Sequence, residues 1–173
     1  MLIRIAFFAA AAVLSAAAFA QDAAKPSDPQ IAHIAYTAGQ IDIASAELAR
    51  SKATNKDVKA FADDMIRDHK AVNEKALALV KKLGVTPEDN DISRSLTKQS
   101  EAKLAELKGL QGPAFDKAYA ASEVAYHKQV NAALKDTLIP AAQNPELKSL
   151  LQTGLKIFEG HEQHAEMVAK ELK

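Results

Sequence analysis

The sequence predicts an all-α protein built as a four-helix bundle, and three observations lead to this prediction. Four segments of about 25 residues carry apolar residues at helical spacing. Proline, glycine and helix-capping residues separate these segments. No segment alternates apolar and polar residues with the two-residue period of a half-buried strand.

The first predicted helix runs from Asp28 to about Lys52, with Asp28 as its expected cap and Pro29 in its first turn. Glu47 projects about 120° away from Ile41 on this helix. No carboxylate of the first helix is therefore expected to point inward. Its predicted apolar stripe consists of Ile34, Ala38, Ile41, Ser45 and Leu48.

The second predicted helix begins after residues 54–57, which resemble a capping box, and ends at Leu83 and Gly84, where glycine can form a left-handed cap. His69 falls about 40° from Met65 on this helix, inside its apolar stripe. A titratable side chain on a buried face needs a polar partner or a function. The stripe itself consists of Val58, Phe61, Met65, Val72, Ala76 and Leu79.

Three further helices are predicted: a weaker amphipathic one over residues 91–108, one from Pro113 to about Ile139 that stops at Pro140, and one from Pro145 to the C-terminus. Short connections make the first and second helices, and the fourth and fifth, antiparallel neighbours. The short middle helix can carry the chain back along the bundle. We therefore predict a ferritin-like four-helix bundle with one long crossover that carries a short extra helix.

The first 20 residues have the features of a cleavable signal peptide. Arg4 gives a positive start, residues 5–17 are apolar, and Ala18 and Ala20 fit a small-x-small cleavage site. The alternative is a membrane anchor, but the apolar run is shorter than the roughly 20 residues that span a bilayer. Residues 21–27 are expected to be a flexible linker and residues 28–173 the bundle domain. We expect a periplasmic or envelope protein without a transmembrane segment in its mature chain.

The overall charge and the cysteine content narrow the possible partners and chemistry. The chain has 22 Lys and Arg residues against 22 Asp and Glu residues, and it has no Cys. A neutral, interspersed charge pattern argues against nucleic acid as a partner. The absence of cysteine excludes thiolate metal sites and cysteine nucleophiles. We expect a monomer or a weak homo-oligomer.

A group of polar residues falls on or beside the predicted inner faces of the helices. Counting from the helix ends places them within about one turn of one another in mid-bundle, provided that the second and fourth helices are parallel. Imidazole combined with carboxylate suits Zn, Mn, Fe or Cu. The sequence therefore predicts a candidate metal site formed by His69, Glu123, His127, His161 and Glu162.

Two interpretations of this group stay open. The residues could hold a metal ion, or they could form a structural polar network in an envelope or stress-response bundle that acts through its surface. A di-iron carboxylate site is disfavoured, because neither His69 nor His127 has Glu three residues before it. No Ser-His-acid arrangement or glycine-rich oxyanion turn indicates a hydrolase. The sequence thus favours a protein that is not an enzyme.

Three linked motifs resemble a known family: Val58-Lys-Ala-Phe61 with Met65 and Asp68-His69, Phe115-Asp-x-x-Tyr119 with His127, and Pro145-x-Leu147-Lys with His161. The resemblance is to bacterial exported proteins with a ferritin-like domain of unknown function, often labelled outer membrane or envelope proteins. It covers nearly the whole mature chain. It implies a ferritin-like bundle in the envelope, with no settled activity. The family often has Leu-Pro shortly before its last histidine, where this chain has Leu155-Lys156.

Overall fold

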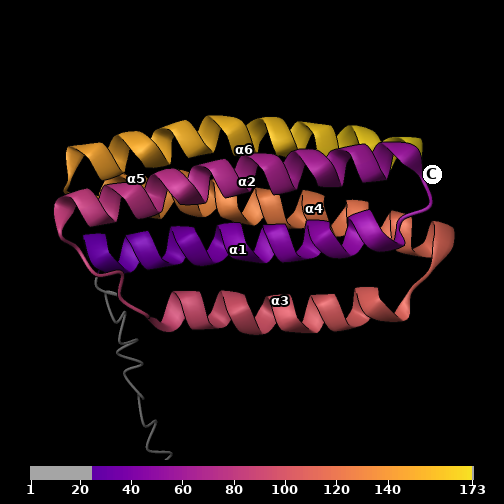
Figure 1. The fold of residues 1–173 in the computed structure, drawn as a ribbon, viewed down its shortest axis with the longest axis horizontal. Coiled ribbons are helices and arrows are strands. Elements are labelled where there is room, and N and C mark those ends of the chain that lie inside the picture. Colours follow the sequence, from indigo (N-terminus) through magenta and orange to yellow (C-terminus); the bar gives the residue numbers. More distant parts are fainter. Residues whose placement is uncertain (1–24, 173) are drawn as a thin grey trace, which may run out of the picture.

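The computed structural model describes residues 25–172, which form a helical bundle (Figure 1). The predicted signal peptide and most of the predicted linker lie outside the described residues. No β-strand occurs between residues 25 and 172, so the prediction of an all-α protein is confirmed. The elements are α1 (Asp28–Lys52), α2 (Lys56–Leu83), α3 (Asp91–Gly109), α4 (Gly112–Ala133), the π-helical η1 (Leu134–Leu138), α5 (Ile139–Ala141) and α6 (Pro145–Glu171).

Four long helices, α1, α2, α4 and α6, pack side by side, while α3 lies outside them along α1 (Figure 1). Short connections make α2 run back along α1 and α6 run back along α4. The helices α2 and α4 run in the same direction, because α3 carries the chain along the bundle between them. The structure thus contains the two predicted helical hairpins and the predicted middle helix.

Capping residues set the helix boundaries largely where the sequence predicts them. The side chain of Asn55 accepts hydrogen bonds from the backbone N–H groups of Asp57 and Val58, and Asn144 caps α6 in the same way. Gly84 ends α2 with a φ of 63°, in the left-handed region that favours glycine. These caps satisfy backbone groups that a helix end leaves without partners.

The cap of α1 differs from the prediction by one residue. Ser27 caps the helix and forms a reciprocal capping box with Gln30. The predicted cap, Asp28, lies in the first turn, where its carboxylate accepts hydrogen bonds of 2.8 Å from the backbone N–H groups of Gln143 and Asn144. Asp28 therefore ties the start of α1 to the start of α6.

The helix that begins as α4 continues past Pro140, where we predicted its end. In η1 the helix widens, and the N–H group of Ile139 bonds to the carbonyl oxygen of Leu134. Proline lacks an N–H donor and crowds the carbonyl group one turn earlier. A π-helical turn changes the hydrogen-bond pattern just before the proline. The helix can therefore run on to Ala141.

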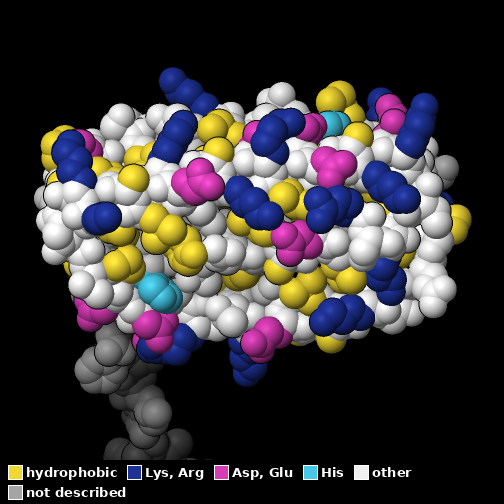
Figure 2. Space-filling view, viewed as in Figure 1, with side chains coloured by type: hydrophobic (Ala, Val, Ile, Leu, Met, Phe, Trp, Pro, Cys, Tyr) yellow, Lys and Arg dark blue, Asp and Glu magenta, His cyan; other side chains and the backbone are white. Residues whose placement is uncertain are grey.

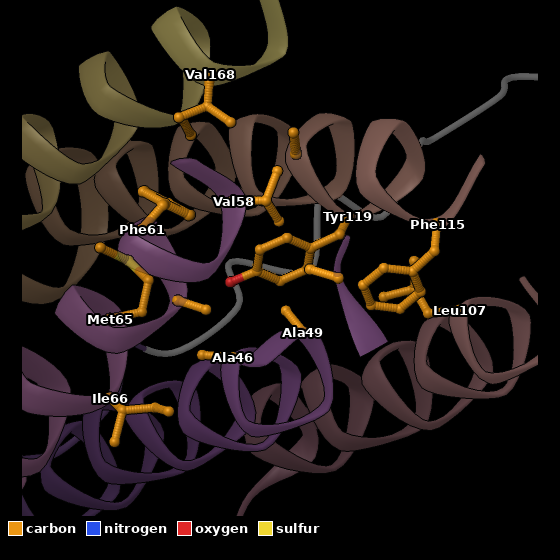
Figure 3. Close-up of a cluster of buried hydrophobic side chains, with 14 residues drawn as sticks. Ala46, Ala49, Val58, Phe61, Met65, Ile66, Leu107, Phe115, Tyr119 and Val168 are labelled. Atoms are coloured by element: carbon orange, nitrogen blue, oxygen red, sulfur yellow. The ribbon is translucent and has the colours of Figure 1, made fainter. Parts of the chain in front are cut away.

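Apolar side chains fill two clusters, one toward each end of the bundle. Figure 3 shows the first cluster, in which the rings of Phe115 and Tyr119 lie parallel with centroids 6.1 Å apart. Fully burying a large apolar side chain stabilises a fold by about 1.5–3 kcal/mol. The second cluster includes Ile31, Ile34, Leu134, Leu138, Leu151 and Phe158.

The face of the molecule seen in Figure 2 is polar and mixed in charge. Figure 2 shows basic and acidic side chains interspersed over one face, with small hydrophobic patches between them. Within residues 25–172, no helix combines the length and the hydrophobicity that crossing a membrane requires.

Candidate metal centre

A buried polar layer separates the two apolar clusters. Along α2, Ile66 belongs to the first cluster and Val72 packs against the second, with His69 between them. The polar residues of α1, α4 and α6 take the same intermediate position. All members of the layer are at most 7% exposed: Asp42, His69, Glu123, His127 and His161.

Three histidine rings meet in this layer from α2, α4 and α6. The ring centroids of His69, His127 and His161 lie 5.3–5.9 Å apart, and one nitrogen of each ring lies within 4.8 Å of the others. This is the mid-bundle convergence that the positions in the sequence predict. His69 also stacks on Phe158, with centroids 4.6 Å apart and an angle of 5° between the rings, so its orientation is fixed by packing.

Asp42 of α1 completes the layer and was not predicted. Its Oδ2 atom lies 3.0 Å from Nε2 of His69 and 3.3 Å from Nε2 of His127. The prediction that the first helix supplies no inward carboxylate was wrong. Glu47, the residue on which that prediction rested, is exposed and pairs with Lys70.

Small residues explain why the buried face of α1 was misplaced. Ile41 and Leu48, two residues of the predicted stripe, are only half-buried. Alanines around Asp42 form the centre of the buried face, because α1 packs between α2 and α3 and is covered on both sides. A helical wheel weighted by large apolar residues misses such a face. The signal that could have located Asp42 is the set of alanines at helical spacing around it: Ala38, Ala46 and Ala49.

Two of the histidines have one ring nitrogen anchored and the other free. Nδ1 of His127 lies 3.0 Å from the carbonyl oxygen of Glu123, which can only accept, so Nδ1 carries the hydrogen and Nε2 keeps its lone pair. Nε2 of His161 lies 3.1 Å from Oδ2 of Asp68, which leaves Nδ1 buried without a partner. Metal-binding histidines usually have their second nitrogen anchored in this way.

The short contacts of Asp42 with the histidines are not hydrogen bonds. Both oxygens of Asp42 and Nε2 of His69 and His127 lack a partner in hydrogen-bond geometry, although they lie 3.0 and 3.3 Å apart. Two ligand atoms bound about 2.0–2.2 Å from one ion lie about 3–3.5 Å from each other. Each of the two distances therefore fits a pair of ligands on one ion, and His127 is the residue shared by the two groups of ligand atoms that lie within 4.8 Å of one another.

Glu123 adds a second carboxyl group beside Asp42. Its Oε1 atom accepts a hydrogen bond of 2.8 Å from Ser45, and its Oε2 atom lies 3.7 Å from Nδ1 of His127. Burial raises the pKa of Glu123 well above its usual range, and the charge of Asp42 raises it further. Burial also opposes the ionisation of Asp42, but interaction with the neighbouring histidines in their protonated form, His69 above all, outweighs burial and lowers the pKa of Asp42. Of the two carboxyl groups, Asp42 is therefore the one that ionises more readily.

Two of the histidines, His127 and His161, favour their neutral form. Burial lowers the pKa of His161 to about 4, although its hydrogen bond to Asp68 acts in the opposite direction. Burial also lowers the pKa of His127, against the attraction of Asp42. Neutral imidazole is the form that binds a metal, so these rings need no deprotonation at neutral pH.

Glu162, the remaining predicted site residue, lies at the border of the layer. It is half-buried, and its Oε2 atom accepts a hydrogen bond of 2.8 Å from Asn131. Its charge favours the protonated form of His127. Two groups of ligand atoms lie within 4.8 Å of one another in the described chain, and Glu162 belongs to neither: His69–His127–His161 and Asp42–Glu123–His127.

The comparisons with known proteins give a family without an assigned activity. Residues 13–168 match a family described as a domain of unknown function, DUF4142. The chain belongs to the DUF4142 family. No curated protein and no solved structure matches it significantly. The function of this DUF4142 protein therefore has to be argued from the buried polar layer.

Even with the inward carboxylate of Asp42, this DUF4142 chain lacks the usual ligand pattern of a di-iron bundle. Such bundles combine a Glu from each of two helices with Glu-x-x-His from each of the other two. The residues three positions before the layer histidines are Ile66, Val124 and Phe158. Three histidines and one carboxylate instead resemble the ligand set of a single ion.

Proposed function

We propose that this DUF4142 protein is an exported metal-binding bundle that holds a transition-metal ion in its buried polar layer. The ligands are His69, His127, His161 and Asp42, with Glu123 beside them and Glu162 outside. Imidazole with carboxylate suits Zn, Mn, Fe or Cu. The observation that carries the proposal is the anchoring of one nitrogen of His127 and of His161, which leaves the other nitrogen of each ring unpaired in the layer.

The energetics of the layer also support a metal ion. A buried polar group without a hydrogen bond costs about 1–3 kcal/mol. The layer gathers several such atoms, among them both oxygens of Asp42 and Nε2 of His69. A bound cation would satisfy these lone pairs together, whereas a purely structural network would have to satisfy each of them with a donor.

Two wider parts of the proposal concern the fold family and the compartment. We infer a ferritin-like bundle, supported by the parallel course of α2 and α4 and by the crossover through α3. We infer a periplasmic or envelope location, supported by the signal-peptide features of residues 1–20. An ion in such a bundle would be protected from solvent by the two apolar clusters.

The alternative is a structural role for the layer in an envelope or stress-response bundle that acts through its surface. Hydrogen bonds from Ser45 to Glu123 and from Asn131 to Glu162 favour this alternative, because they satisfy carboxylates without an ion. In that case the layer would fix how the helices pack and would bind no metal.

Metal analysis distinguishes the two functions. We expect protein purified without chelator to carry about one ion per chain, and the chelator-treated protein to gain thermal stability with Zn²⁺, Mn²⁺, Fe²⁺ or Cu²⁺. His69→Gln should abolish the gain. His33→Gln is the matched control, because His33 lies outside the layer near Asp89. Sub-stoichiometric metal, together with no thermal shift from any of these ions, would contradict the proposal and favour the structural role.

A further inference from the structure

Two adjoining cavities lie between α3 and the rest of the bundle. The first has a volume of about 370 Å³ and lies between α1, α4 and the middle and C-terminal half of α3. The second has a volume of about 180 Å³ and extends from the first turns of α3 into the second apolar cluster. Leu96 and Gln129 line both cavities, so the cavities meet at these side chains. We call the two together the α3 channel.

Small residues on α4 explain why the channel exists. Figure 1 shows α3 outside the four long helices, along α1. Leu96 and Leu104 of α3 line the channel but are only half-buried, because α3 does not close onto α4. The face of α4 that lines the channel carries alanines at helical spacing, which leave the space unfilled: Ala118, Ala121, Ala125 and Ala133.

The channel is elongated, and its walls are mainly apolar. Ile92 lines the second cavity and Leu104 the first, and they lie 12 residues apart on α3, which corresponds to about 18 Å along a helix. A compact molecule would occupy one cavity only, whereas an extended chain can occupy both. The apolar walls include Ile41, Leu96, Leu104, Leu134, Leu138 and Leu151.

The accessible polar groups of the channel lie at its rim. Asp42 and Glu123 contribute to the wall of the first cavity, but both oxygens of Asp42 and the Oε2 atom of Glu123 are buried and offer no surface to a ligand. Lys103 is exposed on α3 and pairs with Glu106, so the charge at the rim is balanced. A molecule in the channel would therefore contact hydrocarbon along its length and polar groups only at one end.

We propose that the α3 channel binds a single linear alkyl chain, as in a fatty acid or a fatty alcohol. The chain lies along α3 and ends in the second cavity, and the head group stays in water at the rim near Lys103. Burial of the chain supplies the affinity, because ligand sites of this kind are mostly apolar with few polar groups. The channel is separate from the proposed metal ligands, and binding of the chain requires no ion.

Calorimetric titration with n-hexanol, n-octanol and n-decanol tests whether the chain is recognised along both cavities. We expect the affinity to rise about fourfold for each added methylene group up to decanol. Decanoate and decanol should differ by no more than about fivefold, the usual limit for the effect of an exposed ion pair. No binding of decanol, an affinity that stops rising after hexanol, or a larger preference for one head group would overturn the proposal.

Three tryptophan variants on exposed positions of α4 locate the chain. Ala121→Trp fills the first cavity and Ala133→Trp the second. Each should weaken decanol binding at least about tenfold, because it displaces two or more methylene groups. Ala132→Trp is the matched control, since Ala132 is exposed beside Ala133 but lines neither cavity, and it should bind decanol like the parent.

The pattern of the three variants decides the outcome. A loss of affinity in only one of Ala121→Trp and Ala133→Trp would place the ligand in a single cavity, and a loss in neither would place it elsewhere, so either result would overturn the proposal. Thermal denaturation checks that each variant is folded. All titrations use chelator-treated protein, so the result is independent of whether the buried layer holds a metal ion.

Discussion

Oδ2 of Asp42 lies 3.0 Å from Nε2 of His69, and both side chains are buried in the centre of the bundle. This contact joins α1 to α2 through polar atoms, although the interior of a helical bundle is usually filled by apolar side chains. An ionised carboxylate at such depth needs compensation by opposite charge or hydrogen bonds. Substitution of Asp42 is therefore the most direct test of the proposed metal site.

Asp42→Asn should weaken metal binding while it preserves the shape of the side chain. Loss of a hydrogen-bonding partner of a ligand typically costs about 10–100-fold in metal affinity, and loss of a charged ligand should cost at least about 100-fold. Competition titration against a metal-binding dye measures the effect. Asp63→Asn is the matched control, since Asp63 lies exposed on α2. Equal metal affinity of Asp42→Asn and the parent would remove Asp42 from the ligand set.

Acid should destabilise the metal-free protein through His161. Burial lowers the pKa of His161 to about 4 in the folded chain, below its ordinary value of 6.5. Between these values the unfolded chain binds more protons, so the free energy of unfolding falls as pH drops from about 6.5 toward about 4. The contribution of His161 to the free energy of unfolding is complete above about pH 6.5. Below that pH, one titrating group can change the free energy of unfolding by at most about 1.4 kcal/mol per pH unit.

The measurement is urea denaturation between about pH 7.5 and about pH 4.5, a range around the histidine reference value. The raised pKa of Glu123 has the opposite effect, because it increases the free energy of unfolding as pH falls. The pH dependence of each variant is therefore compared with that of the parent. His161→Gln should depend less on pH than the parent across this range. If His161→Gln keeps the parental slope, His161 does not titrate as a buried group.

The fold was predictable because local signals agree along the chain. Gly84 and Pro145 mark helix ends with specific backbone chemistry, and the structure uses both, while within the predicted capping segment 54–57 it is Asn55 that caps α2. The course past Pro140 was not predictable, because a π-helical turn has no sequence pattern comparable to a cap. A proline by itself predicts only that the helix ends there.

The candidate site was predictable only where polar residues interrupt stripes of large apolar residues. His69 and His127 lie on such stripes, and the structure places both in the layer. Asp42 lies among alanines, which bury a helix face without marking it strongly by hydrophobicity. The anchoring of His161 by Asp68 joins α2 to α6 and depends on how the two helices pack, which no spacing within one helix reveals.

Two phenylalanine truncations should separate stability from metal binding. Phe61 is fully buried in the first apolar cluster, so Phe61→Ala should cost about 3–5 kcal/mol in free energy of unfolding. Phe158→Ala should also destabilise, and in addition it removes the ring stacked on His69. Urea denaturation gives the stabilities, and metal titration gives the affinities. We expect weaker metal binding in Phe158→Ala than in Phe61→Ala, and equal affinities would show that the stack does not position His69.

Gly39 is required by the close approach of α1 to α2. A Cβ atom at this position would lie 2.4 Å from Oδ1 of Asn73 and 2.9 Å from its Cγ atom. Asn73 is itself buried, so it has to move to make room. Gly39→Ala should therefore destabilise the protein by about 1–3 kcal/mol, the usual effect of overpacking, despite the better helix propensity of alanine.

Gly160→Ala is the matched control, because Gly160 lies exposed in α6 with no atom within 4 Å of the added methyl group. This change should stabilise the protein by about 0.5–1 kcal/mol through the lower backbone entropy of the unfolded chain. Removing the obstruction gives the decisive comparison: in the Asn73→Ala background, Gly39→Ala should cost much less than in the parent. Thermal or urea denaturation of the four chains of this double-mutant cycle measures the difference. Purely additive costs would show that the side chain of Asn73 is not what makes glycine necessary at position 39.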